Sequence, residues 1–204
     1  MIKAIQNTIT MWNLIILSFY FFMLILVPVY WRCYGPQNFL WLCDVGLFLT
    51  LMGFWTNSTL LISMAALETF VIESAWIIDF IGILVFKKSK IMLADYMADP
   101  IYPLWLRLFS LFHIFMPIIW VLYLNAYGYN KLAIYYQIPL FWLILLLSYF
   151  FTDVSKNINW VFLPKIYNLK IGQCYWLILI GLGLPVVIFL PTHYLFLKLF
   201  NVIH

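Results

Sequence analysis

The chain has 204 residues, of which 67% are hydrophobic and 9% are charged, and its mean hydropathy is +1.03. Its 11 Lys and Arg and 7 Asp and Glu residues are too few to coat a soluble domain of this size, so most of the surface must face acyl chains. The composition excludes a soluble enzyme, a disordered segment and a nucleic-acid-binding protein. We expect one all-α membrane domain over residues 1–204.

The apolar runs predict the transmembrane helices. A hydrocarbon core about 30 Å thick requires about 20 mostly apolar residues per helix. Windows of that length predict a bundle of six spans, at approximately residues 12–30, 39–55, 60–86, 104–127, 132–151 and 174–200. The first run exceeds a signal-peptide core and is expected to be retained. Pro185 and Pro191 predict a kink in the last span, with its regular part ending at Pro191.

The distribution of basic residues predicts the orientation. The N-terminus, the second and fourth loops and the C-terminus hold 3 Lys and Arg residues, namely Lys3, Lys131 and Lys198. The other three loops and the adjoining start of span four hold 8, namely Arg32, Lys87, Lys88, Lys90, Arg107, Lys156, Lys165 and Lys170. Cytoplasmic loops are enriched in Lys and Arg. We therefore expect both termini outside, in the periplasm, and a bacterial cytoplasmic (inner) membrane location.

A stripe of small and polar residues follows one face of the second span. Cys43, Gly46, Thr50 and Gly53 recur at helical spacing, which favours close packing against a neighbouring helix. Cys43 also lies near the helix N-terminus, where the dipole favours a thiolate. The residue is either a small apolar filler or a nucleophile. Asp44 follows it at the same depth. Cys33 and Cys174 are interpreted as fillers.

The third span carries three acids, and each ionisable group inside a span is a candidate functional residue because insertion is costly. Glu68 and Asp79 share one helical face, whereas Glu73 points elsewhere. Arg107 and protonated His113 lie at matching depth as basic partners. A structural ion pair and a chemical role are both open. Glu73, Arg107 and, in the last long loop, Trp160 are the candidate substrate-binding residues.

His113 lies four residues before Pro117, whose ring removes the amide that would bond the carbonyl of residue 113. Such an opening is common beside a cavity in a membrane helix. His113 is either a structural histidine or a general base with a near-neutral pKa. His193 is expected near the outer surface, away from this layer. With one histidine in the inner layer, no metal site and no cofactor is predicted.

Two asparagines follow the fifth span on the side of the same inner layer. Asn157 and Asn159 carry amides that suit an oxyanion, and Asp44 or Asp79 is expected to orient His113. The sequence therefore predicts a catalytic layer of Cys43 and His113 with these four supporting residues.

Four short stretches carry a resemblance: residues 41–44 (WLCD), 110–113 (SLFH) with Pro117, 157–162 (NINWVF) and 191–193 (PTH). Over essentially the whole chain they resemble an uncharacterised family of six-span bacterial integral membrane proteins, which implies a fold and no reaction. More remotely, a nucleophile followed two spans later by a histidine is similar to YwaF-like proteins and the androgen-induced-protein group of intramembrane lipid hydrolases and acyltransferases. Those use Thr or Cys with His, which implies that Cys43 is the nucleophile and His113 the base.

Three functions remain open. The first is acyl hydrolysis or transfer on a membrane lipid or another apolar substrate. The second is a small transporter or proton-coupled carrier, in which the intramembrane acids and histidines form a relay at several depths: Glu68, Glu73, Asp79, His113 and His193. The third is a non-catalytic subunit of a membrane complex. Membrane lipids are the expected partners, nucleic acid is not, and a homo-oligomer and a larger complex are both open.

Overall fold

A computed structural model describes residues 2–89, 91–163 and 171–203. Helices dominate it, which confirms the all-α prediction. The α-helices are α1 (Ile2–Tyr34), α2 (Leu42–Thr56), α3 (Thr59–Phe86), α4 (Leu104–Phe109), α5 (Phe112–Tyr127), α6 (Ala133–Phe151), α7 (Gln173–Leu184) and α8 (Leu190–Leu199). Shorter elements are the 3-10 helices η1 (Pro36–Leu40), η2 (Asp95–Met97) and η3 (Ile158–Trp160), the π-helix η5 (Pro185–Phe189), and the strands β1 (Tyr129–Asn130) and β2 (Val202–Ile203).

Five helical segments of the described chain are long and apolar enough to cross a membrane. They are Thr10–Tyr34, Thr59–Phe86, Leu104–Tyr127, Ala133–Phe151 and Gln173–Leu199. The shorter apolar helix α2, with 15 residues, covers most of the second predicted span. These helices identify the chain as an integral membrane protein by length and composition.

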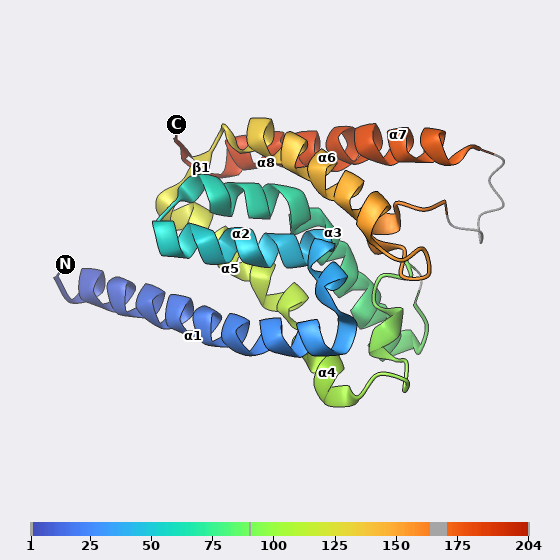
Figure 1. The fold of residues 1–204 in the computed structure, drawn as a ribbon. Helices are drawn as coiled ribbons and strands as arrows, with labels where there is room; N and C mark the ends of the chain where they lie inside the picture. The colour runs from blue at the N-terminus through green and yellow to red at the C-terminus, as the bar shows by residue number, and fades with distance from the viewer. Residues whose placement is uncertain (1, 90, 164–170, 204) are drawn as a thin grey trace.

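The long helices lie alongside one another and alternate in direction, so that both chain termini lie at the same end of the bundle (Figure 1). We call this the terminal end. The opposite end, here the loop end, contains the short helices η1, η2 and η3 (Figure 1). Helix α3 contacts α2, α5, α6 and α8 and is therefore the central element of the bundle.

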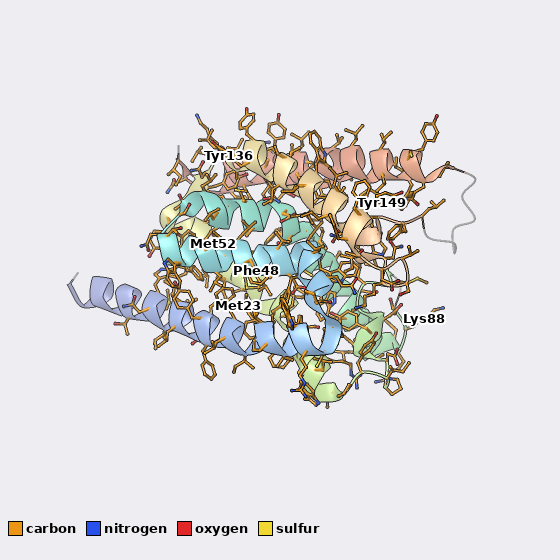
Figure 2. The ribbon with its side chains drawn as sticks, viewed as in Figure 1. Met23, Phe48, Met52, Lys88, Tyr136 and Tyr149 are labelled. Atoms are coloured by element: carbon orange, nitrogen blue, oxygen red, sulfur yellow. The ribbon has the colours of Figure 1, made fainter. Side chains whose placement is uncertain are left out.

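Apolar side chains cover the outside of the bundle as well as its core. Met23 on α1 is 2% exposed, whereas Met52 on α2 and Tyr136 on α6 are 55% and 56% exposed and point outward (Figure 2). A soluble protein does not expose so many large apolar residues around its helices. The outer surface suits contact with acyl chains.

The small residues of α2 pack against α3, as the stripe predicts. A Cβ on Gly53 would lie 2.5 Å from Ile62 Cγ1, and one on Gly46 would lie 3.1 Å from Thr69 Oγ1. Beside them, Trp120 Nε1 of α5 donates to Thr50 Oγ1 at 2.9 Å. The stripe therefore lets three helices approach closely.

The terminal end is closed by backbone hydrogen bonds. Strands β1 and β2 pair in parallel, with Tyr129 opposite Val202. Gly128 has φ +87°, and a Cβ there would lie 2.8 Å from the carbonyl oxygen of Asn201. Since only glycine adopts this conformation freely and leaves room for the facing backbone, Gly128 allows the C-terminal strand to dock.

The last span differs from its prediction. The prolines produce the π-helix η5, as a kink would require, but α8 continues to Leu199, so the regular part does not end at Pro191. Pro185 has no amide for the carbonyl of Gly181, four residues earlier, and this carbonyl accepts a hydrogen bond from Trp142 Nε1 at 2.8 Å instead. The helix therefore resumes in place of ending.

Candidate functional site

A histidine and a glutamate pair inside the bundle, toward the loop end. His113 Nδ1, on α5, bonds Glu73 Oε2, on α3. The Glu73 side chain has no exposed surface, and 9% of the His113 side chain is exposed. Glu73 Oε1 has no hydrogen-bond partner among the described residues. The pair thus keeps one free carboxylate oxygen, and the other ring nitrogen, Nε2, bonds no residue in the described part of the chain.

Aromatic rings hold the imidazole in place. Trp76 stacks on it with ring centroids 4.5 Å apart and an interplanar angle of 21°. Phe112 stacks as well, at 4.2 Å and 29°. Trp76 lies one helical turn after Glu73, so one face of α3 supplies both the carboxylate and the stacked ring. The imidazole plane is therefore fixed before any substrate binds.

The helix that carries His113 is interrupted, but not where Pro117 predicts. Helix α4 ends at Phe109 and α5 begins at Phe112, and Pro117 lies inside α5. The His113 amide donates to the carbonyl oxygen of Ser110 at 3.2 Å across this break. The break turns the Ser110 side chain inward, where its Oγ lies 3.4 Å from the Tyr30 hydroxyl.

A phenol from the loop between α3 and α4 completes this region. Tyr96, in η2, accepts a hydrogen bond from Trp76 Nε1 at 3.1 Å. Burial raises the pKa of the Tyr96 phenol above its ordinary value, and the nearby Cys43 and Glu73 add to the rise. Tyr96 is therefore a neutral hydroxyl at physiological pH, and the hydroxyl of Ser110 lies near it. We call Cys43, Asp44, Glu73, Tyr96 and His113 the inner cluster.

The first turn of α2 brings Cys43 and Asp44 to this cluster. Cys43 is half-buried and lies within electrostatic range of Glu73. It makes no hydrogen bond to His113 within the described residues. Asp44 is 2% exposed; its Oδ2 accepts from Asn38 Nδ2 at 3.0 Å, and its Oδ1 has no partner in the described chain.

Asp79, predicted to orient His113, instead organises a loop. Its carboxylate accepts from the Ser89 hydroxyl at 2.8 and 3.0 Å and from the amides of Ile91, Leu93 and Ala94 at 2.9 to 3.1 Å. Several amides around one carboxylate form an anion-binding turn. Asp79 therefore fixes the segment that leads to Tyr96, and Glu73 holds the histidine in its place.

Arg107 pairs with no acid of the described chain. Its guanidinium Nη1 donates to the carbonyl oxygen of Met97 at 2.5 Å, and its Nε has no partner among the described residues. The arginine links the start of α4 to the loop that carries Tyr96. In this position it supports the loop end and does not join the inner cluster.

The two asparagines predicted to bind an oxyanion have structural partners. Asn159 Oδ1 accepts from the amide of Leu42 at 3.1 Å, and its Nδ2 donates to the Leu40 carbonyl and to Ser148 Oγ. Asn157 exchanges hydrogen bonds with the backbone of Phe162 at 2.8 and 2.9 Å. Both the oxygen and the nitrogen of each side-chain amide therefore have a structural partner. Asn159 provides a partner for the N-terminal amide of α2, which positions Cys43 and Asp44.

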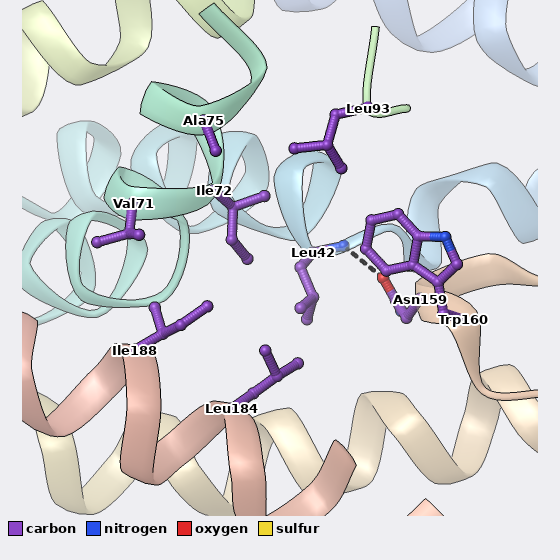
Figure 3. A pocket seen from close by; sticks show the side chains of 9 residues that line it. All are labelled: Leu42, Val71, Ile72, Ala75, Leu93, Asn159, Trp160, Leu184 and Ile188. Carbon is purple, nitrogen blue, oxygen red and sulfur yellow. Dashed lines mark hydrogen bonds between the residues drawn. The ribbon is translucent and has the colours of Figure 1, made fainter. Parts of the chain in front are cut away.

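An apolar cleft of about 200 Å³ lies on another face of α3 (Figure 3). Its lining comes from α2, α3, the loop after α3, η3, α7 and η5: Leu42, Val71, Ile72, Ala75, Leu93, Asn159, Trp160, Leu184 and Ile188. Three lining residues, Val71, Ile72 and Ala75, belong to α3. At 3.6 residues per turn they lie roughly 100 to 200° around the helix from Glu73, so they occupy a different face. Trp160 thus lines a cleft that is separate from the inner cluster.

His193 lies near the terminal end, as predicted, and does not join the cluster. Its Nδ1 lies 2.7 Å from the Tyr129 hydroxyl. Burial raises the pKa of the Tyr129 phenol, which keeps it a neutral partner. Within the described residues, no group of three or more His, Cys, Asp or Glu could hold a metal ion.

Sequence reasoning missed three residues at the site. They are Trp76, which forms a wall of the site, and Tyr96 and Ser110, which supply hydroxyl groups. Trp76 lies three residues after Glu73, and Ser110 lies three residues before His113. That spacing was available in the sequence, because residues three apart share a helical face. No such pattern points to Tyr96, which lies in an irregular loop.

Comparison with known proteins adds no relative. No protein-family model, no curated protein and no solved structure matches the chain. The resemblance to six-span membrane families therefore stays a prediction, and the function has to be argued from the inner cluster.

Proposed function

We propose that this protein is an intramembrane enzyme that hydrolyses or transfers an acyl group of a lipid or another apolar substrate. The observation that supports it most is the buried pair of His113 and Glu73, with Cys43 in the neighbourhood of Glu73. A histidine that donates through Nδ1 to a carboxylate presents Nε2 as a base, and the carboxylate stabilises the imidazolium that forms. Costly groups of this kind inside a membrane are typically retained for function.

The roles follow from the chemistry of these side chains. His113 Nε2 takes the thiol proton of Cys43, and the sulfur attacks the ester carbonyl and forms an S–C bond. The alcohol then leaves with the proton of His113. Water, or a second lipid hydroxyl, is deprotonated by His113, attacks the thioester carbon and releases the Cys43 sulfur, which is reprotonated. The hydroxyl of Tyr96, which accepts from Trp76 and keeps its own proton, is the proposed oxyanion donor.

The proposed mechanism requires the Cys43 side chain to approach the imidazole when substrate binds. Nucleophile and base are often beyond hydrogen-bond distance in unliganded enzymes and close up in the complex. Cys43 is half-buried, and its thiol forms no hydrogen bond to another side chain within the described residues. Rotation about its χ1 is therefore the simplest route.

The proposed setting is a bacterial cytoplasmic membrane, crossed six times, with the loop end in the cytoplasm and both termini in the periplasm. The excess of Lys and Arg in the loops at that end supports this orientation. The inner cluster then faces the cytoplasmic leaflet, and lipids of that leaflet are the expected partners.

The test is mass spectrometry of the purified protein after exposure to a nitrophenyl ester of a long-chain fatty acid. We expect acylation of Cys43 with release of nitrophenol. His113→Gln and Glu73→Gln are expected to slow it at least about 100-fold, the lower range of general-base contributions. Cys33, a free and exposed cysteine, is the internal control, and Cys33→Ala should leave the rate unchanged.

Two outcomes would overturn the proposal. One is acylation of Cys33 at the same rate as Cys43, because an activated thiol must react faster than an exposed one. The other is a rate at Cys43 that does not change in His113→Gln. Cys43→Ser separates thiolate chemistry from a simple steric role, since it keeps the size of the side chain and retains a weaker nucleophile.

A further inference from the structure

Glu68 and Gln137 face each other across the contact between α3 and α6. Both side chains are 0% exposed. Glu68 lies on the α3 face that turns away from Glu73, so it belongs neither to the inner cluster nor to its mechanism. The side-chain amide of Gln137 lies beside the carboxyl group of Glu68.

None of the four polar atoms of the two side chains completes a hydrogen bond to the described residues. Leaving a buried polar atom unpaired costs about 1 to 3 kcal/mol, and an isolated carboxylate in an apolar medium costs far more. Two facing side chains with every polar atom unpaired therefore require an explanation.

The charged and titratable groups on the surrounding helices do not supply a counter-charge. On α3 the next acid is Glu73, which is bonded to His113 of α5. On α8 the histidine is His193, bonded to Tyr129. Asp44 of α2 lies toward the loop end with Asn38. Among the described residues, no Lys or Arg forms an ion pair with Glu68.

One proton would satisfy all four atoms. A carboxylic acid donates its O–H to the amide oxygen, and the amide N–H donates back to the carboxyl carbonyl, which closes a two-bond ring. A metal cation would pair with the three oxygens but leave the amide nitrogen unpaired. The geometry points to Glu68 and Gln137 as an intramembrane proton-binding site, in which Glu68 is the neutral acid and Gln137 its partner.

This site gives the α3–α6 contact a second state. When the proton leaves, Glu68 becomes a carboxylate. The Gln137 amide nitrogen can still donate a hydrogen bond to it, but the Gln137 amide oxygen then faces a negative charge. A lone buried charge is not stable in such an interior. Release of the proton therefore requires α3 and α6 to separate and admit water. The inference does not depend on the acyl-transfer proposal, because it involves neither Cys43 nor His113.

The test is infrared difference spectroscopy of the purified protein in liposomes at neutral pH, as wild type minus Glu68→Gln. We expect the carbonyl stretch of a protonated, hydrogen-bonded carboxylic acid, which moves to lower frequency in D₂O. Gln137→Met keeps the length of the side chain and removes its amide, so the band should move to higher frequency. Glu73→Gln is the matched control and should leave the band in place.

Three outcomes would overturn the inference. A carboxylate signal in place of the acid band shows that Glu68 is ionised. An acid band unmoved by Gln137→Met shows that the amide is not the partner. Loss of the band in sodium chloride but not in choline chloride assigns a sodium ion in place of the proton. Each variant is judged by its infrared spectrum. If Gln137→Met does not fold, the comparison of wild type with Glu68→Gln still tests the acid band, because that substitution preserves the packing against Gln137.

Discussion

The two buried histidines show how differently the two ends of one bundle are built. His113, toward the loop end, bonds a carboxylate, and next to it Glu73 Oε1 and Asp44 Oδ1 lack partners among the described residues. His193, toward the terminal end, bonds the neutral phenol of Tyr129 at 2.7 Å. The same side chain therefore bonds an acidic group at one end and a neutral hydroxyl group at the other.

The surroundings repeat this contrast. At the terminal end, Gly53 packs on Ile62, the strands β1 and β2 pair, and the Asn130 amide donates to Ser63 Oγ at 3.0 Å. At the loop end, the carboxylate of Asp79 holds a loop against α3 through its amides. Apart from the facing Glu68 and Gln137, the described terminal half is organised by close packing and satisfied hydrogen bonds. The loop end instead combines a fixed scaffold with unpaired polar atoms, as expected where chemistry takes place.

The largest effect is expected at the inner pair. His113→Leu leaves the buried Glu73 carboxylate without its partner and should lower the free energy of unfolding by about 3 to 5 kcal/mol. Thermal unfolding in detergent micelles, followed by circular dichroism, measures it. The double variant Glu73→Leu, His113→Leu removes both groups and should recover most of the loss, because a buried pair replaced by apolar residues is often neutral. A double variant as unstable as the single one would show that packing dominates.

The next effect tests the packing of the terminal end. In Gly53→Ala the new methyl group meets Ile62 Cγ1 at 2.5 Å, so α2 and α3 must separate. Overpacking of this kind costs about 1 to 3 kcal/mol. Gly183→Ala, in α7, is the control, since a Cβ there has no atom within 4 Å. Equal unfolding temperatures for the two variants would contradict the close contact.

A smaller effect compares the two histidines directly. Tyr129→Phe removes the hydroxyl bonded to His193 and should cost about 0.5 to 1.5 kcal/mol, the net value of one neutral hydrogen bond. The fatty-acyl labelling of Cys43 should not change, because this pair lies outside the inner cluster. A loss of labelling in Tyr129→Phe with unchanged stability would mean that the two ends are coupled.

The sequence predicted the helices better than the partners. Long apolar runs and the stripe from Cys43 to Gly53 specify helices and a packing face, because hydrophobic length and helical period act locally. The helical period also predicted that Glu73 and Glu68 lie on different faces of α3. It could not choose Glu73 over Asp44 or Asp79 as the partner of His113, because pairing depends on how α3 and α5 dock.

The loops were the least predictable. Asp79 accepts from the amides of Ile91, Leu93 and Ala94, and Asn159 bonds the backbone at the start of α2. Neither loop segment has a periodic pattern from which to infer such contacts. The catalytic roles predicted for Asp79 and Asn159 were based only on their expected depth in the membrane. In addition, the π-helix after Leu184 depends on how the chain accommodates Pro185 within a packed helix. The proline therefore predicts where the helix is irregular, but not that it forms a π-helix there and then continues.

The smallest effect is a pH dependence at the surface of the loop end. The Ser155 amide donates to Asp153 Oδ1 at 2.7 Å, and this bond lowers the pKa of the Asp153 carboxyl. A lowered pKa contributes stability that is complete above the ordinary value of about 4 and is lost as the pH falls through the folded value. Asp153→Asn should therefore slightly flatten the decrease in unfolding temperature on acidification. Asp95→Asn, at another exposed loop position, should not, and an equal change in both would assign the slope to overall charge.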